Sequence, residues 1–329
     1  MRLVIASSVS VVIPAYRAAG TLRQAVGSCL QQAEPRNIFV VLDGPDDDIE
    51  LVRTATKDVR LITLRERKGA PVCRNVGLEL ADTEYVLFLD ADDYLEAPFL
   101  NSAKEAAEAV NADMVFGRFA FELPDGIRIS INPSERYGDL NPSTVVKKWL
   151  QGQFTPSSAL LWRSSFVRAL GGWDETLVRN QDGDLVYRAL LRDPVLACCT
   201  GGQGVYVMHQ RPGRISKSLN HRALESQIVV LNKIRNRAAD LSSDLSEELS
   251  IAYYNLARIA FRIDNEDIGR AAENAARDLG LKGQPGTMKH SIIATALGLR
   301  RKERLSQFFK QLIGVQSKNQ SAFEYPGGR

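Results

Sequence analysis

The sequence predicts an α/β sandwich, a mostly parallel sheet with helices on both faces, followed by an all-helical C-terminal region. Up to about residue 218, short runs rich in Val, Ile, Leu and Phe alternate with helical stretches, which is typical of parallel strands buried on both faces. From residue 220 onward the strands stop and apolar residues recur at helical spacing. We therefore predict two domains, residues 1–218 and residues 219–329.

Each element is predicted from its local pattern. Strands are expected over residues 10–13, 38–42, 60–64, 85–89 and 114–119, with helices over 21–32, 48–56, 71–80 and 98–110 between them. Residues 118–131 predict a hairpin that turns at Pro124-Asp125-Gly126, because these residue types favour turns. Further strands are expected over 158–162 and 204–208, and helices over 141–150 and 184–191.

The composition excludes several classes of protein. The 42 basic and 39 acidic residues give a net charge of +3, which is too balanced to indicate a nucleic-acid binder. The four cysteines form no C-x-x-C pair, so neither a zinc site nor a disulfide framework is expected. The start has no signal-peptide pattern, and no apolar run reaches the length of about 18 residues that a membrane span needs. We expect a cytoplasmic protein.

Three carboxylates follow a predicted buried strand at Asp90-Ala91-Asp92-Asp93. In an open α/β sheet, ligands bind beyond the carboxyl ends of the strands, so this cluster is expected at the mouth of a site. Crowded carboxylates repel one another unless a cation neutralises them, and oxygen ligands suit Mg²⁺ or Mn²⁺. The alternative is an acidic turn that caps the following helix.

A second acidic segment follows the strand at 38–42. Asp43 precedes a glycine and could accept hydrogen bonds from a base or a ribose, as acidic residues in dinucleotide folds do. Asp46, Asp47 and Asp48 are expected instead to cap the next helix and to favour its dipole.

Two later segments carry further candidates. Asp182 and Asp184 lie near a predicted helix start, where either could act as a general base toward a sugar hydroxyl or could simply cap the helix. Arg211 lies in a loop of small and basic residues at 208–216, which suits a diphosphate leaving group or could be a solvated basic loop.

Taken together, the order and spacing of these motifs resemble the family 2 glycosyltransferases of GT-A fold, over about two thirds of the chain. The motifs that carry the resemblance are residues 9–16, Asp43-Gly44, Arg74-Asn75 with Gly77, Asp90 to Asp93, residues 171–175, and residues 211–213 before Ser216.

The resemblance implies a role for each matching residue. Asp43 matches the residue that holds the uracil of a UDP-sugar, Asp182 the catalytic base, and Asp92 the direct metal ligand, with Asp90 and Asp93 nearby. Two positions depart from the family pattern: Gln181 stands where a Glu usually precedes the base, and Leu42 where an Asp usually precedes Asp43. The residues implied to bind the nucleotide-sugar are Pro14, Ala15, Tyr16, Asp43, Arg74, Asp90, Ala91, Asp92 and Arg211.

The implied activity is inverting sugar transfer that depends on Mg²⁺ or Mn²⁺, from a nucleotide-sugar donor to a saccharide or lipid-linked saccharide acceptor in polysaccharide biosynthesis. A nucleotidyltransferase or a dehydrogenase is a rival interpretation, but the Gly-rich loop expected after the first strand is missing. A second rival is a non-catalytic nucleotide-sugar-binding scaffold of the same fold, although that class is expected to lose the carboxylates retained here.

The helical tail is basic, with eight Lys or Arg and one acid, Glu303, between Lys282 and Lys318. Residues 291–313 predict a helix whose apolar face could lie on an anionic membrane, at the inner face of the cytoplasmic membrane. The same face could instead pack on the first domain or on another subunit of an oligomer. The apolar face comprises Leu305, Phe308, Phe309 and Leu312, and the basic residues are Arg300, Arg301, Lys302, Arg304 and Lys310.

Overall fold

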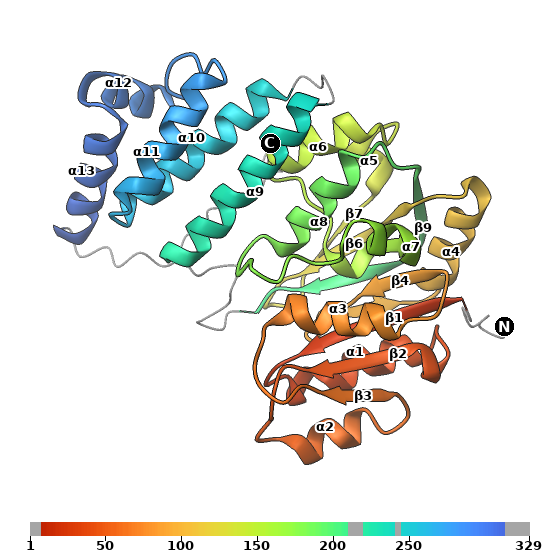
Figure 1. Cartoon of the computed structure of the whole chain (residues 1–329). Helices are drawn as coiled ribbons and strands as arrows, with labels where there is room; N and C mark the ends of the chain where they lie inside the picture. Colours follow the sequence, from red (N-terminus) through yellow and green to blue (C-terminus); the bar gives the residue numbers. More distant parts are fainter. Residues whose placement is uncertain (1–7, 210–219, 241–244, 313–329) are drawn as a thin grey trace. The chain divides into compact units, whose positions relative to one another are not determined.

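The computed structural model describes residues 8–209, 220–240 and 245–312 of the 329-residue chain (Figure 1). It consists of two compact units. The first unit comprises Met1–Val145, Phe154–Glu175 and Gln181–Arg211, and the second comprises Val146–Gln153, Thr176–Asn180 and Pro212–Arg329. The second unit thus takes two short segments from within the first predicted domain, and the division at residue 218 stays a prediction.

One nine-stranded sheet forms the centre of the first unit, in the order β3-β2-β1-β4-β8-β6-β9-β5, with β7 paired to β6. The first four of these strands are parallel to one another. Beyond them the sheet is mixed, because β8 runs antiparallel to both β4 and β6 while β9 runs parallel to β6. The α/β class is confirmed, with a sheet that is less uniformly parallel than the sequence predicts. The strands are β1 (Val9–Ala15), β2 (Ile38–Leu42), β3 (Arg60–Thr63), β4 (Tyr85–Phe88), β5 (Tyr94–Glu96), β6 (Met114–Glu122), β7 (Arg128–Ile131), β8 (Leu160–Arg163) and β9 (Leu196–Val207).

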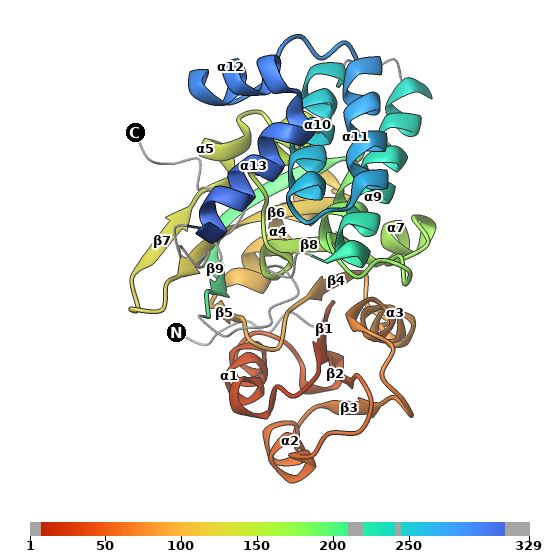
Figure 2. The ribbon, with the colours of Figure 1, turned by 90° about the vertical axis from the view of Figure 1, so that its left-hand side faces the viewer.

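Helices cover both faces of the parallel strands, with α1 and α3 on opposite sides of β1 (Figure 2). Val11 and Ile13 of β1 join the hydrophobic cluster that contains α1 and α4 residues. Val12 faces α3, where a Cβ added at Gly77 would lie 2.2 Å from its Cγ1. The continuous apolar run of β1 is therefore explained by burial on both sides. The helices of this unit are α1 (Ala19–Leu30), α2 (Ile49–Ala55), α3 (Ala70–Leu80), α4 (Phe99–Val110), α5 (Pro133–Tyr137), α7 (Ser164–Ala169) and α8 (Gln181–Leu190).

The structure differs from the sequence prediction at several elements. The helix α8 begins at Gln181, three residues earlier than predicted, so Asp182 and Asp184 lie in its first turn. The predicted strand at 60–64 is present as β3, but it is partly exposed because it forms an edge of the sheet. The sequence prediction misses β5, α5, α7 and the first half of β9, all of which are short or interrupted by small residues.

The described residues of the second unit form helices joined by turns and loops, without a strand. A Cβ added at Gly269 of α11 would lie 2.4 Å from the Phe261 ring of α10, so these helices pack at short range. Across residues 8–209, 220–240 and 245–312, no helix is both long and apolar enough to span a bilayer. The helices are α9 (His221–Asp240), α10 (Ser246–Arg262), α11 (Glu266–Asp278), α12 (Met288–Leu297) and α13 (Leu299–Leu312), and α6 (Pro142–Leu150) ends in this unit.

The single basic helix expected over 291–313 is two helices, since Gly298 separates α12 from α13 with φ of 79°. Arg304 lies 2.9 Å from an Asp264 oxygen and 3.0 Å from a Glu266 oxygen, and Arg300 lies 2.7 Å from Glu266. These two cations are thus engaged within the unit. The side chains of Phe308, Phe309, Lys310 and Leu312 lie outside the described part of the chain.

Glu303 of α13 is the centre of a buried ion cluster. Its side chain has no exposed surface, and Arg262 Nε lies 2.6 Å from one oxygen. Arg258 Nε and Lys302 Nζ each lie 3.0 Å from the other oxygen. Burial alone would raise the pKa of Glu303, but the hydrogen bond and charge of Arg262, with the hydrogen bonds of Arg258 and Lys302, lower this pKa to about 2.

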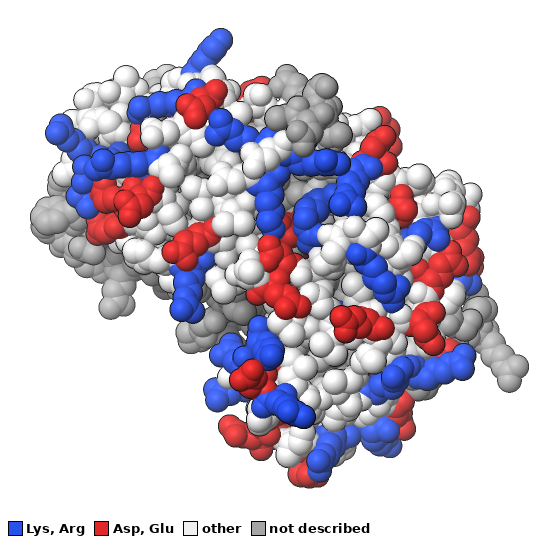
Figure 3. Space-filling model, in the orientation of Figure 1, with Lys and Arg blue, Asp and Glu red and all other residues white. Residues whose placement is uncertain are grey.

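Surface charge is mixed on the face shown in Figure 3, where Lys and Arg lie interspersed with Asp and Glu. This agrees with the nearly equal numbers of basic and acidic residues in the sequence.

Candidate active site

The three carboxylates after β4 have separate partners. Asp90 Oδ1 lies 2.6 Å from Arg74 Nη2, and Asp93 Oδ1 accepts a hydrogen bond of 2.9 Å from the Val207 amide. Asp92 Oδ2 lies 3.5 Å from His209 Nε2. Asp93 is therefore bound to β9 through the Val207 amide, whereas Asp90 and Asp92 contact other residues. Within the described residues, no group of three or more His, Cys, Asp or Glu side chains is arranged to hold a metal ion.

Asp92 and His209 nevertheless provide a donor set that fits a divalent cation. His209 Nε2 is buried and makes no hydrogen bond with the described residues. An imidazole nitrogen next to a carboxylate oxygen suits Mn²⁺ and related ions. His209 lies in the loop 208–216 that is predicted to suit a diphosphate, but the sequence does not single it out as a metal ligand. Its position two residues after β9 is the kind of strand end where ligands bind. The predicted Arg211 lies outside the described residues.

Arg74 of α3 connects Asp90 to the start of α8. Its side chain is 5% exposed, and besides Asp90 it lies 3.8 Å from Asp182 Oδ1. Its Nη1 donates a hydrogen bond of 3.3 Å to Gln181 Oε1. One buried guanidinium thus contacts residues from two motifs that lie about a hundred positions apart in the sequence.

Asp182 combines partial exposure with one buried carboxylate oxygen. Its Oδ1 is buried and accepts no hydrogen bond from the described residues, while the side chain as a whole is 43% exposed. Desolvation raises the pKa of Asp182 to about 6; the Arg74 charge opposes this rise and the Asp90 charge adds to it. A carboxyl with this pKa is largely ionised at pH 7 and retains more proton affinity than an ordinary aspartate.

Asp184, the alternative base, is engaged in a contact that holds the fold together. It is buried, and its Oδ2 accepts a hydrogen bond of 2.8 Å from Arg188 Nε. Arg188 also donates to the carbonyls of Leu170 and Gly172. Asp184 therefore holds the arginine that ties α8 to the Gly171-Gly172 turn, whereas Asp182 Oδ1 accepts no hydrogen bond from the described residues.

Asn75 fixes the segment that follows this turn. Its amide accepts a hydrogen bond of 2.8 Å from the Trp173 N–H and donates to the Trp173 carbonyl and to Glu175 Oε1, at 2.9 and 2.8 Å. Gly172 has φ of 68°, and a Cβ there would lie 2.6 Å from Asn75 Oδ1. The close approach of Asn75 therefore requires glycine at this position.

Asp43 and Tyr16 lie at the ends of β2 and β1. Asp43 Oδ1 accepts hydrogen bonds from the amides of Lys68 and Gly69, at 2.6 and 2.9 Å, so this carboxylate also shapes the loop before α3. The Arg67 guanidinium lies 4.1 Å from the centroid of the Tyr16 ring. The residue Tyr16 is 39% exposed. Arg67 is a further candidate that the sequence analysis missed, although it lies in a conspicuously basic loop, residues 65–68.

Pro14, Ala15 and Ala91 contribute mainly backbone. Pro14 and Ala15 pair with Val41 and Leu42 of β2, and the Ala15 carbonyl accepts a hydrogen bond of 2.9 Å from the Asp43 amide. Ala91 is 7% exposed.

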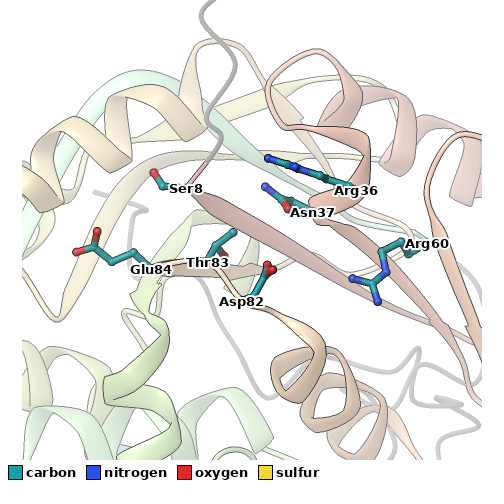
Figure 4. Close-up of a pocket in the computed structure, with 7 residues that line it drawn as sticks. All are labelled: Ser8, Arg36, Asn37, Arg60, Asp82, Thr83 and Glu84. Carbon is teal, nitrogen blue, oxygen red and sulfur yellow. The ribbon is translucent and has the colours of Figure 1, made fainter.

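A cavity of about 400 Å³ lies elsewhere in the first unit (Figure 4). Its walls come from the amino ends of the parallel strands and the residues before them, whereas Asp43 and Asp90 follow the carboxyl ends. This cavity is therefore separate from the candidate site. The residues that line it are Ser8, Arg36, Asn37, Arg60, Asp82, Thr83 and Glu84.

The structure has a GT-A type α/β fold, with Asp43 and Asp90 beyond the carboxyl ends of the parallel strands β2 and β4. Residues 10–166 match the model of the family Glycosyl transferase family 2.

Several known proteins are similar to the chain. The pre-mycofactocin glycosyltransferase of Mycobacterium tuberculosis is 29% identical over 194 residues, which cover 55% of this chain and 39% of that protein. The UDP-Glc:alpha-D-GlcNAc-diphosphoundecaprenol beta-1,3-glucosyltransferase WfaP of Escherichia coli is 37% identical over 90 residues, 26% of this chain and 36% of WfaP. The matches thus span less than half the length of either relative.

Among solved structures, S. aureus TarS 1-349 in complex with UDP-GlcNAc matches with a TM-score of 0.56 and 17% identity, covering 82% of this chain and 91% of that chain. This likeness confirms the predicted fold.

Proposed function

We propose that the chain transfers a sugar from a UDP-sugar to a saccharide or lipid-linked saccharide acceptor in polysaccharide biosynthesis, with inversion at the anomeric carbon and in dependence on Mg²⁺ or Mn²⁺. The observation that carries this proposal is Asp182, a partly exposed carboxyl with a pKa of about 6 and one buried oxygen that accepts no hydrogen bond from the described residues.

In this mechanism Asp182 accepts the proton of the acceptor hydroxyl as that oxygen attacks the anomeric carbon. A single displacement from the face opposite the leaving group inverts the configuration. A covalent intermediate would need a second free carboxylate at this place, whereas Asp184 is engaged by Arg188 and Asp90 by Arg74. The described contacts therefore support direct transfer.

Asp92 and His209 are the residues that would hold the divalent cation. Such a cation acts as a Lewis acid toward the leaving diphosphate. Asp90 keeps its place through Arg74, and Asp93 holds β9 next to His209 through the Val207 amide.

The donor is proposed to be a UDP-sugar for two reasons. Asp43 matches the family's uracil-binding residue, and its Oδ2 lies 3.7 Å from Nε of Arg67, the residue over the Tyr16 ring. Tyr16 is partly exposed and offers a flat surface for a base. In addition, TarS is solved with UDP-GlcNAc, and the name of WfaP states a UDP-sugar donor and a diphosphoundecaprenol-linked acceptor. A lipid-linked acceptor would fit a cytoplasmic protein working at the membrane surface.

The proposal is tested by incubating the full chain with UDP-glucose, UDP-galactose or UDP-GlcNAc, Mn²⁺ and saccharide or lipid-diphosphate acceptors. We expect UDP release, a product of inverted configuration by NMR, and loss of turnover in excess EDTA. Asp92→Ala should abolish transfer without lowering Tm, whereas Asp125→Ala, in the β6–β7 turn, should change neither. Full turnover in EDTA would refute the metal dependence, and the absence of UDP release with every donor would refute the transferase activity.

A further inference from the structure

The role of Arg74 follows from its contacts rather than from the family pattern. We propose that Arg74 is a positioning residue, which holds Asp182 in place for the acceptor through one guanidinium shared with Asp90, instead of binding the donor as the sequence predicts. The inference rests on the proposed function of Asp182 as the base.

The first observation is the burial of Arg74. Only 5% of its side chain is exposed, while the Asp182 side chain is 43% exposed and Asp90 is 31% exposed. A ligand in the site can therefore touch the two carboxylates far more easily than the guanidinium between them. This arrangement suits a role in which Arg74 acts through Asp90 and Asp182 rather than by touching the ligand.

The second observation is that both terminal nitrogens of the guanidinium are hydrogen-bonded, whereas Nε makes no hydrogen bond with the described residues. Nη2 donates a hydrogen bond of 2.6 Å to Asp90 Oδ1, and Nη1 donates to Gln181 Oε1. The guanidinium carbon also lies 4.2 Å from the centroid of the Trp173 ring. Trp173 is held in turn by Asn75, the residue after Arg74 in α3. Helix α3 therefore positions both the cation and the aromatic ring that supports it.

The third observation is the charge that surrounds Asp182. Arg74 from α3 is the cation near Asp182 Oδ1, Asp90 after β4 is the anion, and the preceding residue, Gln181, is uncharged. The Arg74 charge lowers the pKa of Asp182 and the Asp90 charge raises it. Without Arg74, the carboxyl would keep the repulsion of Asp90 and lose the attraction that opposes it.

The test compares Arg74→Gln, Arg74→Lys and Gln181→Ala in the full chain with Arg163→Gln as the matched control. Arg163 is also a largely buried arginine that pairs with a carboxylate, Glu84 at 2.6 Å, and lies over an aromatic ring, Tyr85. It pairs with the amino end of β4, whereas Asp90 follows the carboxyl end. The control therefore reports the cost of losing a similar ion pair away from the site.

For Arg74→Gln we expect kcat to fall by at least tenfold at pH 7, and the acid limb of the kcat profile to move upward by about one pH unit. The Kd of UDP in Mn²⁺, measured by calorimetry, should stay within about twofold of wild type, because Arg74 contacts neither Asp92 nor His209, the residues proposed to hold the cation. Arg74→Lys should recover part of kcat, and Gln181→Ala should lower kcat less than Arg74→Gln does. Arg163→Gln should leave the acid limb in place.

A double-mutant cycle separates positioning from donor binding. If Arg74 acts through Asp182, adding Arg74→Gln to Asp182→Asn should lower kcat by less than about threefold further. Additive losses, or a weaker Kd for UDP with unchanged kcat, would overturn the inference. If Arg74→Gln does not fold, Gln181→Ala decides: a lower kcat with unchanged UDP affinity supports the inference, and a normal kcat refutes it.

The inference and the proposed function fail in different ways. When wild type releases no UDP from any of the donors, the proposed function itself is wrong. When wild type turns over and the acid limbs of wild type and Arg74→Gln coincide, only the role of Arg74 is wrong.

Discussion

Two carboxyls lie near arginine, Asp182 in the first unit and Glu303 in the second, but their pKa values shift in opposite directions. Glu303 has no exposed surface and receives hydrogen bonds from Arg258, Arg262 and Lys302. Asp182 has one arginine at 3.8 Å, and the oxygen nearest to it accepts no hydrogen bond from the described residues. The pKa is about 2 for Glu303 and about 6 for Asp182.

The difference teaches that the number of hydrogen-bonded cations decides the outcome more than burial does. Desolvation raises the pKa of both groups, but at Glu303 three donors overcome it. At Asp182 the single cation, Arg74, forms its short contact with Asp90 instead. A carboxylate that accepts several hydrogen bonds from cations stabilises the fold. A carboxylate with an oxygen that accepts none remains able to take a proton.

The largest effect is expected at Asp182. Asp182→Asn removes the proton acceptor but keeps the shape of the side chain, so kcat should fall by about 10² to 10⁴ with donor affinity nearly unchanged. Steady-state kinetics and UDP binding would measure the two quantities. Asp184→Asn is the comparison: if it loses turnover while Tm stays normal and Asp182→Asn is active, the base is misassigned.

The next effect is one of stability. Glu303→Gln leaves Arg258 and Arg262 without their buried partner, which should destabilise the second unit by about 3 to 5 kcal/mol. Urea denaturation followed by circular dichroism would measure the loss. A change below about 1 kcal/mol would show that the cluster contributes little to the fold.

The pH dependence should separate the two groups. The ionised form of Asp182 is the active one, so kcat should be constant near pH 7.5 and fall about tenfold per pH unit below its pKa of about 6. The pKa of Glu303 is lower in the folded state than its ordinary 4.5, so its stabilisation is present above pH 4.5 and is lost as the pH falls toward 2. Activity loss and acid unfolding should therefore occur in different pH ranges. Coincidence of the two would contradict the assignment.

The smallest effect is expected for an exposed pair. Arg304→Gln removes contacts to Asp264 and Glu266 on a side chain that is 45% exposed, and should cost about 0 to 1 kcal/mol. The same urea experiment as for Glu303→Gln applies. A loss of stability as large as that of Glu303→Gln would show that the exposed ion pairs contribute as much as the buried cluster of Glu303.

The fold was largely predictable because its main strands, such as β1 and β2, are continuous apolar runs that are buried along their whole length. The hydrophobic pattern of the sequence did not predict strands that form because of their pairing with neighbouring strands. The first half of β9 contains Cys, Thr and Gly, yet it pairs with β6 through Leu196 to Cys199. The three-residue β5 is likewise set by its pairing with β9 rather than by a pattern of its own.

In the candidate site, the sequence could indicate the polar residues at strand ends but not their partners. Asp93 binds an amide 114 positions later, and Asp43 binds amides 25 and 26 positions later. Such pairings depend on how the sheet brings loops together, which residue spacing does not encode. His209 and Arg67 were missed for the same reason, since each becomes informative only beside Asp92 or Tyr16.

The position of Glu303 also limits how the protein can be divided. Glu303 on α13 supplies the only negative charge that Arg258 and Arg262 contact among the described ion pairs, so shortening the chain after about Lys282 would leave two cations of α10 without a partner. The resulting fragment should expose charge and apolar surface at once and be prone to aggregate.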